Sequence, residues 1–464
     1  MKKRGLTVAL ILGSLFWAAP AFGQDDVTLE GVAEAAANTQ AIMDNLWLVI
    51  AGAMVFLMQA GFAFVEAGLT RAKNIANIMA KNLADMAIGA VAFFIIGWSI
   101  AYGTSDSHWW GGLNDFFFKD SGDPNALFDM SAGLSPATNF FFQVVFAATA
   151  VTIASGAMAE RTKFSGYLIF SAFMTGLIYP VVVHWTWGGG LIAQINIGGR
   201  VYSDFAGSTI VHLTGGVAAL VGAAILGPRL GKYGPNGEPR AIPGHNVGFA
   251  VIGVFILWFG WFGFNAGSEL AADGLLSFLA MNTLMAAAAG VIGASIVVYL
   301  KTGVADVAMA GNGALAGLVS ITAPVGTVEP WAALVIGFIG GMLVVFAVLF
   351  FDKIRIDDPV GAIAVHGVCG IWGTLSIGVF GRYDDAFLGE ENVGLIYGGG
   401  VEQLLVQALM VVIVIAWVGI TSFLVFTAID KTIGLRVDEE EEVMGLDVAE
   451  HGSAGYGLES VGLS

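Results

Sequence analysis

The chain has 464 residues, of which 57% are hydrophobic and only 12% are charged, whereas soluble globular proteins carry about 25% charged residues. This composition excludes an ordinary soluble domain, the net charge of −17 argues against nucleic-acid binding, and the single cysteine, Cys369, excludes an intramolecular disulfide. Long apolar stretches alternate with short polar ones, which predicts an all-α integral membrane protein with many spanning helices.

The segment 1–23 predicts a signal peptide. Lys2 to Arg4 form a positively charged start, Leu6–Ala19 is apolar, and small residues precede a cleavage point at Gln24. Because the apolar run is shorter than the ~20 residues that a span needs, cleavage is favoured over an uncleaved first helix. Residues 24–45 would then form an extracytoplasmic N-terminal segment.

The rest of the chain predicts a membrane domain at 46–428 with about eleven spans, followed by a tail at 429–464. The eighth span is the weakest prediction, because it is rich in Gly and Ala and contains Asp306 and Asn312, so we expect other helices to enclose it. The predicted spans are Leu46–Gly68, Leu83–Tyr102, Ala137–Met158, Gly166–Trp185, Gly207–Leu226, Val247–Ala266, Leu275–Leu300, Val304–Ala323, Trp331–Phe351, Val360–Phe380 and Leu404–Thr427.

The Lys and Arg residues of the predicted loops set the orientation in the cell (inner) membrane. A mature N-terminus outside and an odd number of spans place the C-terminal tail in the cytoplasm, and the positive charges then gather strongly on the cytoplasmic side, as the positive-inside rule requires. The predicted cytoplasmic set is Arg71, Lys73, Lys81, Arg161, Lys163, Arg229, Lys232, Arg240, Lys301, Lys353, Arg355, Lys431 and Arg436, and the outer set is Lys119, Arg200 and Arg382.

An internal duplication relates the fifth and tenth predicted spans. The segments 204–216 and 358–370 both read D-x-x-G-x-x-x-V-H-x-x-x-G, which aligns His212 with His366. The two segments are five spans apart, and because five is odd, the two halves must be inverted relative to each other in the membrane. Inverted repeats are a recurring design of transporters, with the site near the midplane where the repeats meet. The fold is therefore predicted as a five-plus-five inverted repeat plus a final helix.

The spacing within the duplicated motif places both histidines deep in the membrane. Each histidine follows its aspartate by eight residues, roughly 12 Å along a helix, and the hydrocarbon core is about 30 Å thick. His212 and His366 therefore approach the midplane from opposite faces, where we expect them to come within hydrogen-bonding distance. Two alternatives are packing histidines and a metal pair, but an intramembrane ionisable residue is by default a functional candidate, and no Cys, Asp or Glu ligand lies beside them.

Long segments around these histidines resemble the signature stretches of the ammonium transporter family (Amt/Mep/Rh), and the resemblance covers Leu46 to about Tyr456. The tail is also similar to the C-terminal region of this family. The segments that carry the resemblance are Trp187–Gly190, Asp204–His212, Gly260–Ser268, Val365–Gly370, Gly434–Val437, Gly445–Asp447 and His451–Gly452. The first 45 residues and the first outer loop are longer than in many members, so nothing is carried over there.

The resemblance implies a role for seven residues in a pore for ammonium and ammonia. Trp185 neighbours Trp187, and the assignment depends on which of them precedes the glycines. The implied roles are recruitment of the ion by Trp187 and Ser268, a stacked gate of Phe146 and Phe264, twin pore histidines His212 and His366, and support of the recruitment site by Asp204.

Trp187 and Ser268 are typical of the Amt branch rather than the Rh branch, which favours ammonium over a neutral-gas channel. The family implies no cofactor and no metal, a homotrimer with one pore in each subunit, methylammonium as a transported analogue, and a PII-type signal protein as a partner of the tail. An ammonium sensor is an alternative, but no large signalling domain follows the last span. A membrane enzyme is disfavoured, because no nucleophile or metal motif is present.

Overall fold

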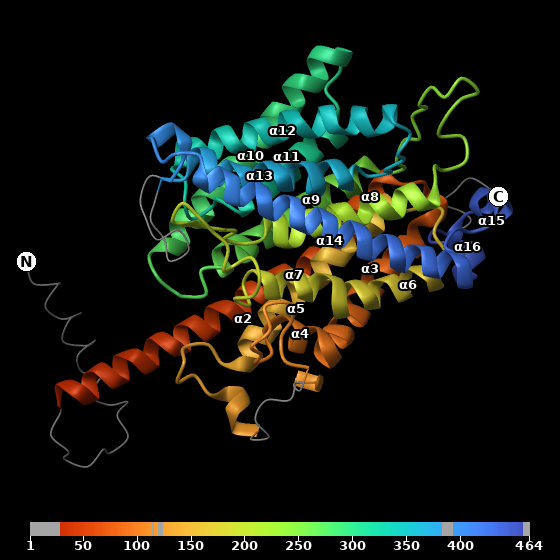
Figure 1. Cartoon of the computed structure of the whole chain (residues 1–464). Helices are drawn as coiled ribbons and strands as arrows, with labels where there is room; N and C mark the ends of the chain where they lie inside the picture. Colours follow the sequence, from red (N-terminus) through yellow and green to blue (C-terminus); the bar gives the residue numbers. More distant parts are fainter. Residues whose placement is uncertain (1–27, 114–115, 119–123, 383–392, 458–464) are drawn as a thin grey trace, which may run out of the picture.

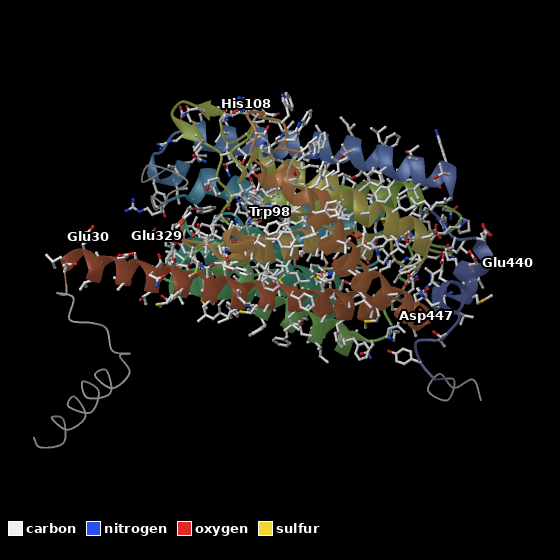
Figure 2. All side chains as sticks on the ribbon, turned by 90° about the horizontal axis from the view of Figure 1, so that it is seen from below. Glu30, Trp98, His108, Glu329, Glu440 and Asp447 are labelled. Carbon is white, nitrogen blue, oxygen red and sulfur yellow. The ribbon has the colours of Figure 1, made fainter. Side chains whose placement is uncertain are left out.

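The computed structural model describes residues 28–113, 116–118, 124–382 and 393–457, so the predicted signal peptide lies outside the described residues. The spanning helices form one bundle, and the C-terminal helices α15 and α16 lie at one end of it (Figure 1). We name this the tail end, which Glu440 and Asp447 mark in Figure 2. Glu30 and Glu329 mark the opposite end, which we name the loop end.

Within the described residues, ten helical segments are long and apolar enough to cross a membrane, and α11 is a shorter apolar helix, in agreement with the predicted count of about eleven. Many large apolar side chains face outward, as a lipid environment requires; Leu300, for example, is 79% exposed. The spans in chain order are α2 (Leu29–Leu69), η1 (Ala72–Asn74) with α3 (Ile75–Ala92), η2 (Phe93–Gly97) and α4 (Trp98–Tyr102), α5 (Pro136–Ala157), α6 (Phe164–Phe173) with η5 (Met174–Ile178) and α7 (Tyr179–Trp185), η6 (Ser208–Leu213) with α8 (Thr214–Leu226), α9 (Val247–Gly267), α10 (Leu275–Thr302), α11 (Val307–Thr322), α12 (Pro330–Lys353), η7 (Ile363–Val368) with α13 (Cys369–Phe380), and α14 (Glu402–Thr432).

The remaining elements are short and lie at the two ends of the bundle. They are η3 (Phe116–Phe118), η4 (Pro124–Phe128), the hairpin of β1 (Asn196–Ile197) and β2 (Arg200–Val201), η8 (Leu395–Tyr397), α15 (Glu439–Met444) and α16 (Leu446–His451).

The first span is longer than predicted, because α2 begins at Leu29 and continues without a break into the membrane domain. Thr28 caps this helix by accepting a hydrogen bond from the Gly31 N–H group. Much of the segment 24–45, predicted to precede the first span, is therefore helical and continuous with it. At the other end of the chain, α14 runs to Thr432, beyond the predicted start of the tail at 429.

The second span begins earlier than predicted, and this corrects the position of Lys81. We predicted a cytoplasmic loop for Lys81, but this residue lies within α3 and is 0% exposed. Its Nζ donates to the Ser155 carbonyl at 3.0 Å, and the carboxylates of Glu66 and Asp85 attract it. A charge enters the interior when it is paired there. Hydropathy missed this position because two of the partners, Glu66 and Ser155, come from other spans.

The eighth span, α11, is enclosed by other helices, as predicted. Every residue from Asn312 to Thr322 is buried, and the helix packs against α9, α10, α12 and α13. Asp306 begins it by accepting a hydrogen bond from the Met309 N–H group.

The inverted halves meet where equivalent spans cross. The first span of each half, α2 and α9, run in opposite directions: the Trp47 indole donates to the Ala266 carbonyl at one end, and the Asn246 N–H group donates to the Gly68 carbonyl at the other. The fifth and tenth spans cross through the glycines of the duplicated motif. A Cβ atom on Gly216 would lie 2.4 Å from the Gly367 nitrogen. Only glycine permits this approach of two backbones.

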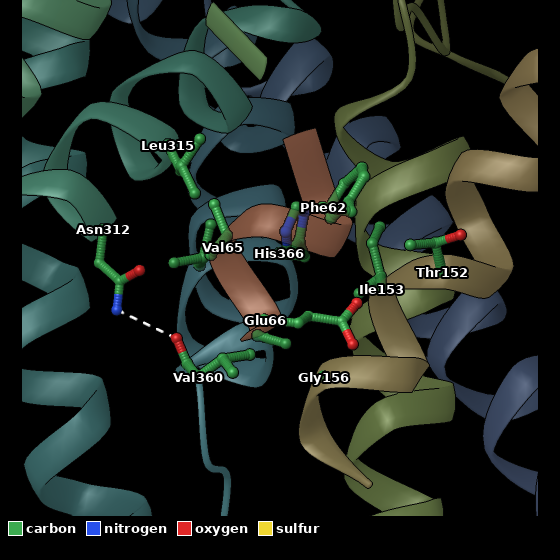
Figure 3. Close-up of a pocket in the computed structure, with 12 residues that line it drawn as sticks. Phe62, Val65, Glu66, Thr152, Ile153, Gly156, Asn312, Leu315, Val360 and His366 are labelled. Carbon is green, nitrogen blue, oxygen red and sulfur yellow. Dashed lines mark hydrogen bonds between the residues drawn. The ribbon is translucent and has the colours of Figure 1, made fainter. Parts of the chain in front are cut away.

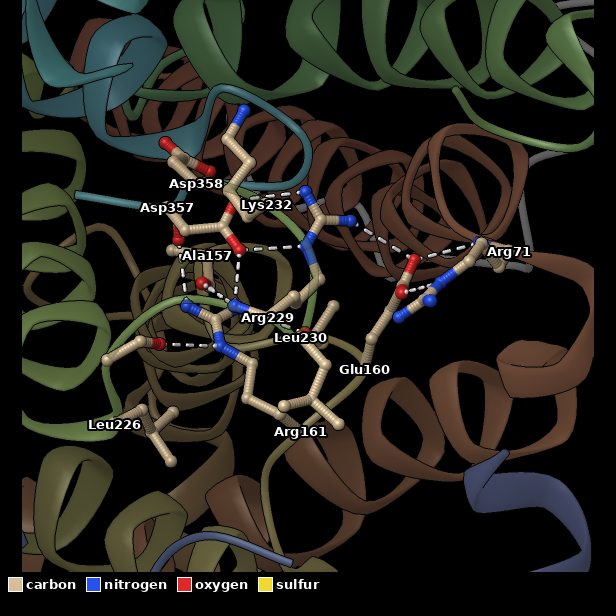
Figure 4. A network of polar contacts seen from close by, with 12 residues as sticks. Arg71, Ala157, Glu160, Arg161, Leu226, Arg229, Leu230, Lys232, Asp357 and Asp358 are labelled. Atoms are coloured by element: carbon tan, nitrogen blue, oxygen red, sulfur yellow. Dashed lines mark hydrogen bonds and ion pairs between the residues drawn. The ribbon is translucent and has the colours of Figure 1, made fainter. Parts of the chain in front are cut away.

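A network of buried ion pairs ties loops of both halves together at the tail end (Figure 4). Glu160, after α5, pairs with Arg71, after α2, and with Arg229, after α8. Arg229 also binds both carboxylate oxygens of Asp357 at 2.8 and 2.9 Å. Burial opposes ionisation of Asp357, but the hydrogen bonds and charge of Arg229 outweigh it and lower the pKa of Asp357 to about 2.

The tail packs against these loops, as predicted. The Leu446 N–H group donates to Asn74 Oδ1 at 3.0 Å. We expected Arg436 to pair with a carboxylate there, and its guanidinium does pair, at 2.7 Å, with Glu442, which belongs to the tail itself. Glu442 in turn accepts a hydrogen bond at 2.7 Å from the backbone of Leu230, in the loop after α8. This carboxylate therefore joins the tail to the membrane domain.

The crossing of spans five and ten gives a stability prediction. Gly216→Ala should lower the free energy of unfolding by about 1–3 kcal/mol, because the new methyl group overlaps the backbone at Gly367. Gly419→Ala is the matched control, since its Cβ would lie 3.8 Å from Val217, an ordinary contact. Thermal unfolding of the purified proteins in detergent measures both, and equal melting temperatures would contradict the close crossing.

Candidate functional site

The duplicated aspartates hold the starts of the two half-helices. The Asp204 carboxylate accepts hydrogen bonds from four backbone N–H groups and from the Tyr202 hydroxyl; the backbone donors are those of Gly207, Ser208, Thr209 and Ile210. Asp358 does the same for the other half, accepting from Gly361 and Ile363. Burial raises the pKa of both aspartates, and these backbone donors oppose the rise. Each carboxylate thus satisfies donors that a buried helix start leaves unpaired.

Each capped start leads directly into a π-helical turn, η6 or η7, that carries one histidine. The Nδ1 atoms of His212 and His366 lie 3.2 Å apart, and the residues are 0% and 4% exposed. The predicted approach of the two histidines is confirmed. Because one Nδ1 donates and the other accepts, one ring keeps a bare Nε2 acceptor and the other an Nε2–H donor. The pair can therefore both give and accept a hydrogen bond.

Aromatic rings cover the pair on its loop-end side. The His212 ring contacts both Trp261 and Phe264, with ring centroids 5.1 and 5.3 Å away, and the latter two rings also contact each other at 5.7 Å. Its Nε2 atom is buried and has no hydrogen-bond partner among the described residues. Phe264 stacks in turn on Phe146, with the ring centroids 4.1 Å apart and an angle of 26° between the ring planes. The stacking expected for these two phenylalanines is present.

A cavity of about 550 Å³ opens on the loop-end side of the Phe146 ring, and Trp187, Asp204 and Ser268 also line it. The Trp187 indole donates to the Asp204 carbonyl at 3.0 Å, and its ring meets Phe146 edge to face at 6.2 Å. Trp185 faces elsewhere, where its indole donates to the Trp109 carbonyl. The tryptophan that directly precedes the glycines is thus the one at the cavity.

The Ser268 hydroxyl donates to the Phe264 carbonyl at 2.8 Å, so its lone pairs are left to accept hydrogen bonds in the cavity. Gln143 was missed by the sequence analysis. It lines the same cavity, and its Oε1 atom is buried without a hydrogen-bond partner among the described residues. The signal available was its position three residues before Phe146, which puts both side chains on one face of α5.

The opposite side of the histidine pair is narrow. His366 borders a cavity of about 20 Å³ with Phe62, Val65 and Glu66, and Figure 3 shows these side chains around it. This volume is enough for one water-sized molecule. Together, the wide cavity, the stacked rings, the histidine pair and the small cavity form a column from the loop end toward the tail end. In the part of the chain that is described, no group of three metal-ligating side chains occurs.

The column suits a small cation that can lose a proton. An aromatic face and hydrogen-bond acceptors at the wide cavity favour a cation rich in donors. Between the Phe146–Phe264 stack and His366, the aromatic rings and two imidazoles form the described walls, so an intact ion there would lose its hydration without gaining a countercharge.

Comparison with known proteins places the chain among membrane transporters. The profile of the Ammonium Transporter Family matches residues 46–456. Ammonium transporter Amt2 of Archaeoglobus fulgidus is 46% identical over 430 residues, which cover 90% of this chain and 89% of that protein. Ammonium transporter Amt1 of Haloferax mediterranei is 40% identical over 435 residues, with coverages of 89% and 79%.

Solved structures of Amt and Mep proteins also match the chain. The structure named Sensor Amt Protein matches with a TM-score of 0.81 and 39% identity over 89% of this chain and 99% of its own. Mep2 of Candida albicans matches with a TM-score of 0.76 and 28% identity over 86% of this chain and 87% of its own.

The cap on the fifth span gives a prediction. In Asp204→Asn, an amide group replaces one oxygen and leaves backbone donors unpaired, which should cost about 1–3 kcal/mol of stability. Asp306→Asn is the matched control, because Asp306 accepts one such bond at an exposed helix start and Asn caps equally well. Thermal unfolding should separate the two variants, and the idea fails if both melt as the unaltered protein does.

Proposed function

Because the chain belongs to the ammonium transporter family, we propose that it recruits ammonium at Trp187 and Ser268, removes a proton, and passes ammonia along His212 and His366. The observation that carries this proposal is the column itself. A polar, aromatic cavity leads through the stacked Phe146 and Phe264 rings to two hydrogen-bonded imidazoles.

Recruitment follows from the groups at the wide cavity. The Trp187 ring offers a π-face to a cation, and the Ser268 hydroxyl and Gln143 Oε1 offer oxygens to the N–H donors of ammonium. These contacts replace part of the hydration shell. Asp204 does not reach the ion with a free carboxylate, because its oxygens are occupied by backbone donors, so it acts by holding the fifth span in place.

Deprotonation follows from what lies beyond the stacked rings. Ammonium and potassium ions are similar in size and charge, so a charged pore would separate them poorly. Ammonium alone can release a proton, and neutral ammonia can then pass a column whose aromatic walls disfavour ions. The Nε2 atoms of His212 and His366 supply the hydrogen bonds that ammonia would otherwise lose.

The tail end is assigned to the cytoplasm on the distribution of positive charge, and the cavity at the loop end then faces outside the cell membrane. By the family resemblance, the protein is a homotrimer with one pore in each subunit, and a PII-type signal protein docks near the ordered tail. Methylammonium serves as the transported analogue.

A sensor is the second candidate, because one structural neighbour is named Sensor Amt Protein. A sensor would bind ammonium without sustained flux, and an Rh-like gas channel would pass ammonia without a recruitment site. Uptake of radiolabelled methylammonium, with and without Trp187→Ala, separates the three. Flux that depends on Trp187 supports the proposal, absence of flux favours the sensor, and flux indifferent to Trp187 favours the gas channel.

The histidine pair gives a selectivity prediction. His366→Asp should let potassium through, because a fixed negative charge stabilises an intact cation in the column. Potassium currents across proteoliposome membranes measure this change. His108→Asp is the control, since His108 is exposed in the loop-end segment 103–135. Potassium exclusion in His366→Asp would count against deprotonation as the source of selectivity.

The tail gives a further prediction. Glu442→Ala should lower the initial rate of methylammonium uptake, because it removes both the Arg436 pair and the bond to Leu230 that hold the tail in place. Glu440→Ala, two residues away and exposed, should leave the rate unchanged. Protein yield in the membrane fraction confirms insertion, and equal rates in the two variants would show that the packing of the tail does not affect transport.

A further inference from the structure

Three ionisable side chains lie inside the bundle, apart from the histidine pair. Glu66 on α2 and Lys81 and Asp85 on α3 are 2%, 0% and 0% exposed. Charged groups within membrane spans are costly, pair with one another and mark functional positions. The transport steps described above use none of the three.

Asp85 is well supplied with donors. The Tyr167 hydroxyl donates to its Oδ2 atom at 2.7 Å, and the Ser171 hydroxyl donates to its Oδ1 atom at 3.0 Å. A third hydroxyl, that of Thr152, lies 3.2 Å from Oδ2. Donors on both oxygens favour the ionised carboxylate, and Lys81 attracts Asp85 as well as Glu66.

Glu66 is held differently. Its Oε2 atom accepts a hydrogen bond from the Ser155 hydroxyl at 2.7 Å, and Lys81 and the Asn82 amide also act on the carboxylate. Its Oε1 atom is buried and has no hydrogen bond of good geometry among the described residues. Glu66 also lines the small cavity that His366 borders (Figure 3). Apart from these two residues, Thr152 and Asn312, the walls of this cavity are apolar. A molecule that passes His366 therefore meets the Glu66 carboxyl group next.

The charges of the cluster do not balance when all three groups are ionised, because two carboxylates face one ammonium group. An uncompensated buried charge is expensive, and one bound proton removes it. Tyr167 and His366 also face the cluster, as neutral groups. Glu160 and Arg161 act on Lys81 from the tail end, but the first is paired with arginines and the second with backbone carbonyls. Since hydroxyl donors contact both oxygens of Asp85 but only one oxygen of Glu66, Glu66 holds the proton.

We propose that Glu66 is the proton-exchange residue at the inner end of the pore, an inference that rests on the proposed passage of ammonia past His366. The Glu66 O–H bond breaks as an N–H bond forms on ammonia, giving ammonium and the Glu66 carboxylate. Lys81 and the new ammonium ion balance the carboxylate until ammonium leaves at the tail end. Hydronium from cytoplasmic water then restores the proton, and the cycle is complete.

The test uses the full-length protein in proteoliposomes, with ammonium-evoked current and methylammonium uptake measured as the tail-side pH is varied. Glu66→Gln keeps the shape and the Ser155 bond but cannot exchange a proton. We expect its rate to fall about tenfold or more, since a positioned proton-transfer group contributes about 10²–10⁴-fold, and its dependence on tail-side pH to flatten. Glu30→Gln, exposed on the same helix, is the control.

Two further variants, which change the number of charges in the cluster, test the role of Glu66 even if Glu66→Gln folds poorly. Asp85→Asn leaves Glu66 as the sole partner of Lys81 and should fix it as a carboxylate, so transport should fall as in Glu66→Gln. Adding Lys81→Met removes the cation, lets Glu66 regain its proton and should recover much of the lost rate. The inference is overturned if Asp85→Asn transports at the rate of the unaltered protein, or if the double variant with Lys81→Met recovers none of the lost rate.

The outcomes also separate this inference from the transport proposal. If the unaltered protein carries neither current nor methylammonium, the transport proposal fails and this inference falls with it. If it transports and Glu66→Gln matches it in rate and in pH dependence, only the role of Glu66 is lost.

Discussion

The bonds from Asp204 and Asp358 to backbone N–H groups are the interaction on which the pore depends. Each of these helices starts within the bundle, where water cannot satisfy the first donors of a helix, so a carboxylate must do so. Because each aspartate fixes the start of its span, the histidine eight residues later is placed at a fixed depth. Two such starts, facing each other in inverted halves, bring the imidazoles together at 3.2 Å.

The same shortage of water decides where charge is tolerated. Buried charges at the tail end are met by opposite charges, as between Arg229 and Asp357, or by backbone carbonyls, as at Arg161, and this network joins loops from both halves. Between the stacked phenylalanines and His366 the column carries no carboxylate or ammonium group among its described walls, which suits a neutral passenger. The cluster of Glu66, Lys81 and Asp85 is the exception, because two carboxylates face one ammonium group. Its position beside the narrow cavity suits Glu66 to proton exchange with a molecule in the column.

The tail is coupled to the pore by a chain of short contacts. Glu442 joins the tail to the loop after α8, and α8 carries the crossing with the tenth span through Gly216. A protein that docks on α15 and α16 therefore contacts a segment connected mechanically to the helices that carry the histidines. This connection gives a physical route by which a cytoplasmic partner could regulate transport.

Hydropathy and a duplicated motif were enough to predict the membrane architecture, the inverted repeat and the approach of His212 and His366, because both are properties of position along the chain. The aromatic residues beside the histidines were predicted only from the resemblance to the family. The tertiary structure alone decided the early start of the second span, the burial of Lys81, the place of Gln143 at the cavity, and the cluster of Glu66, Lys81 and Asp85. The reason is that a charge becomes acceptable inside a membrane only through its partners, and two partners of Lys81, Glu66 and Ser155, come from other spans that folding brings beside it.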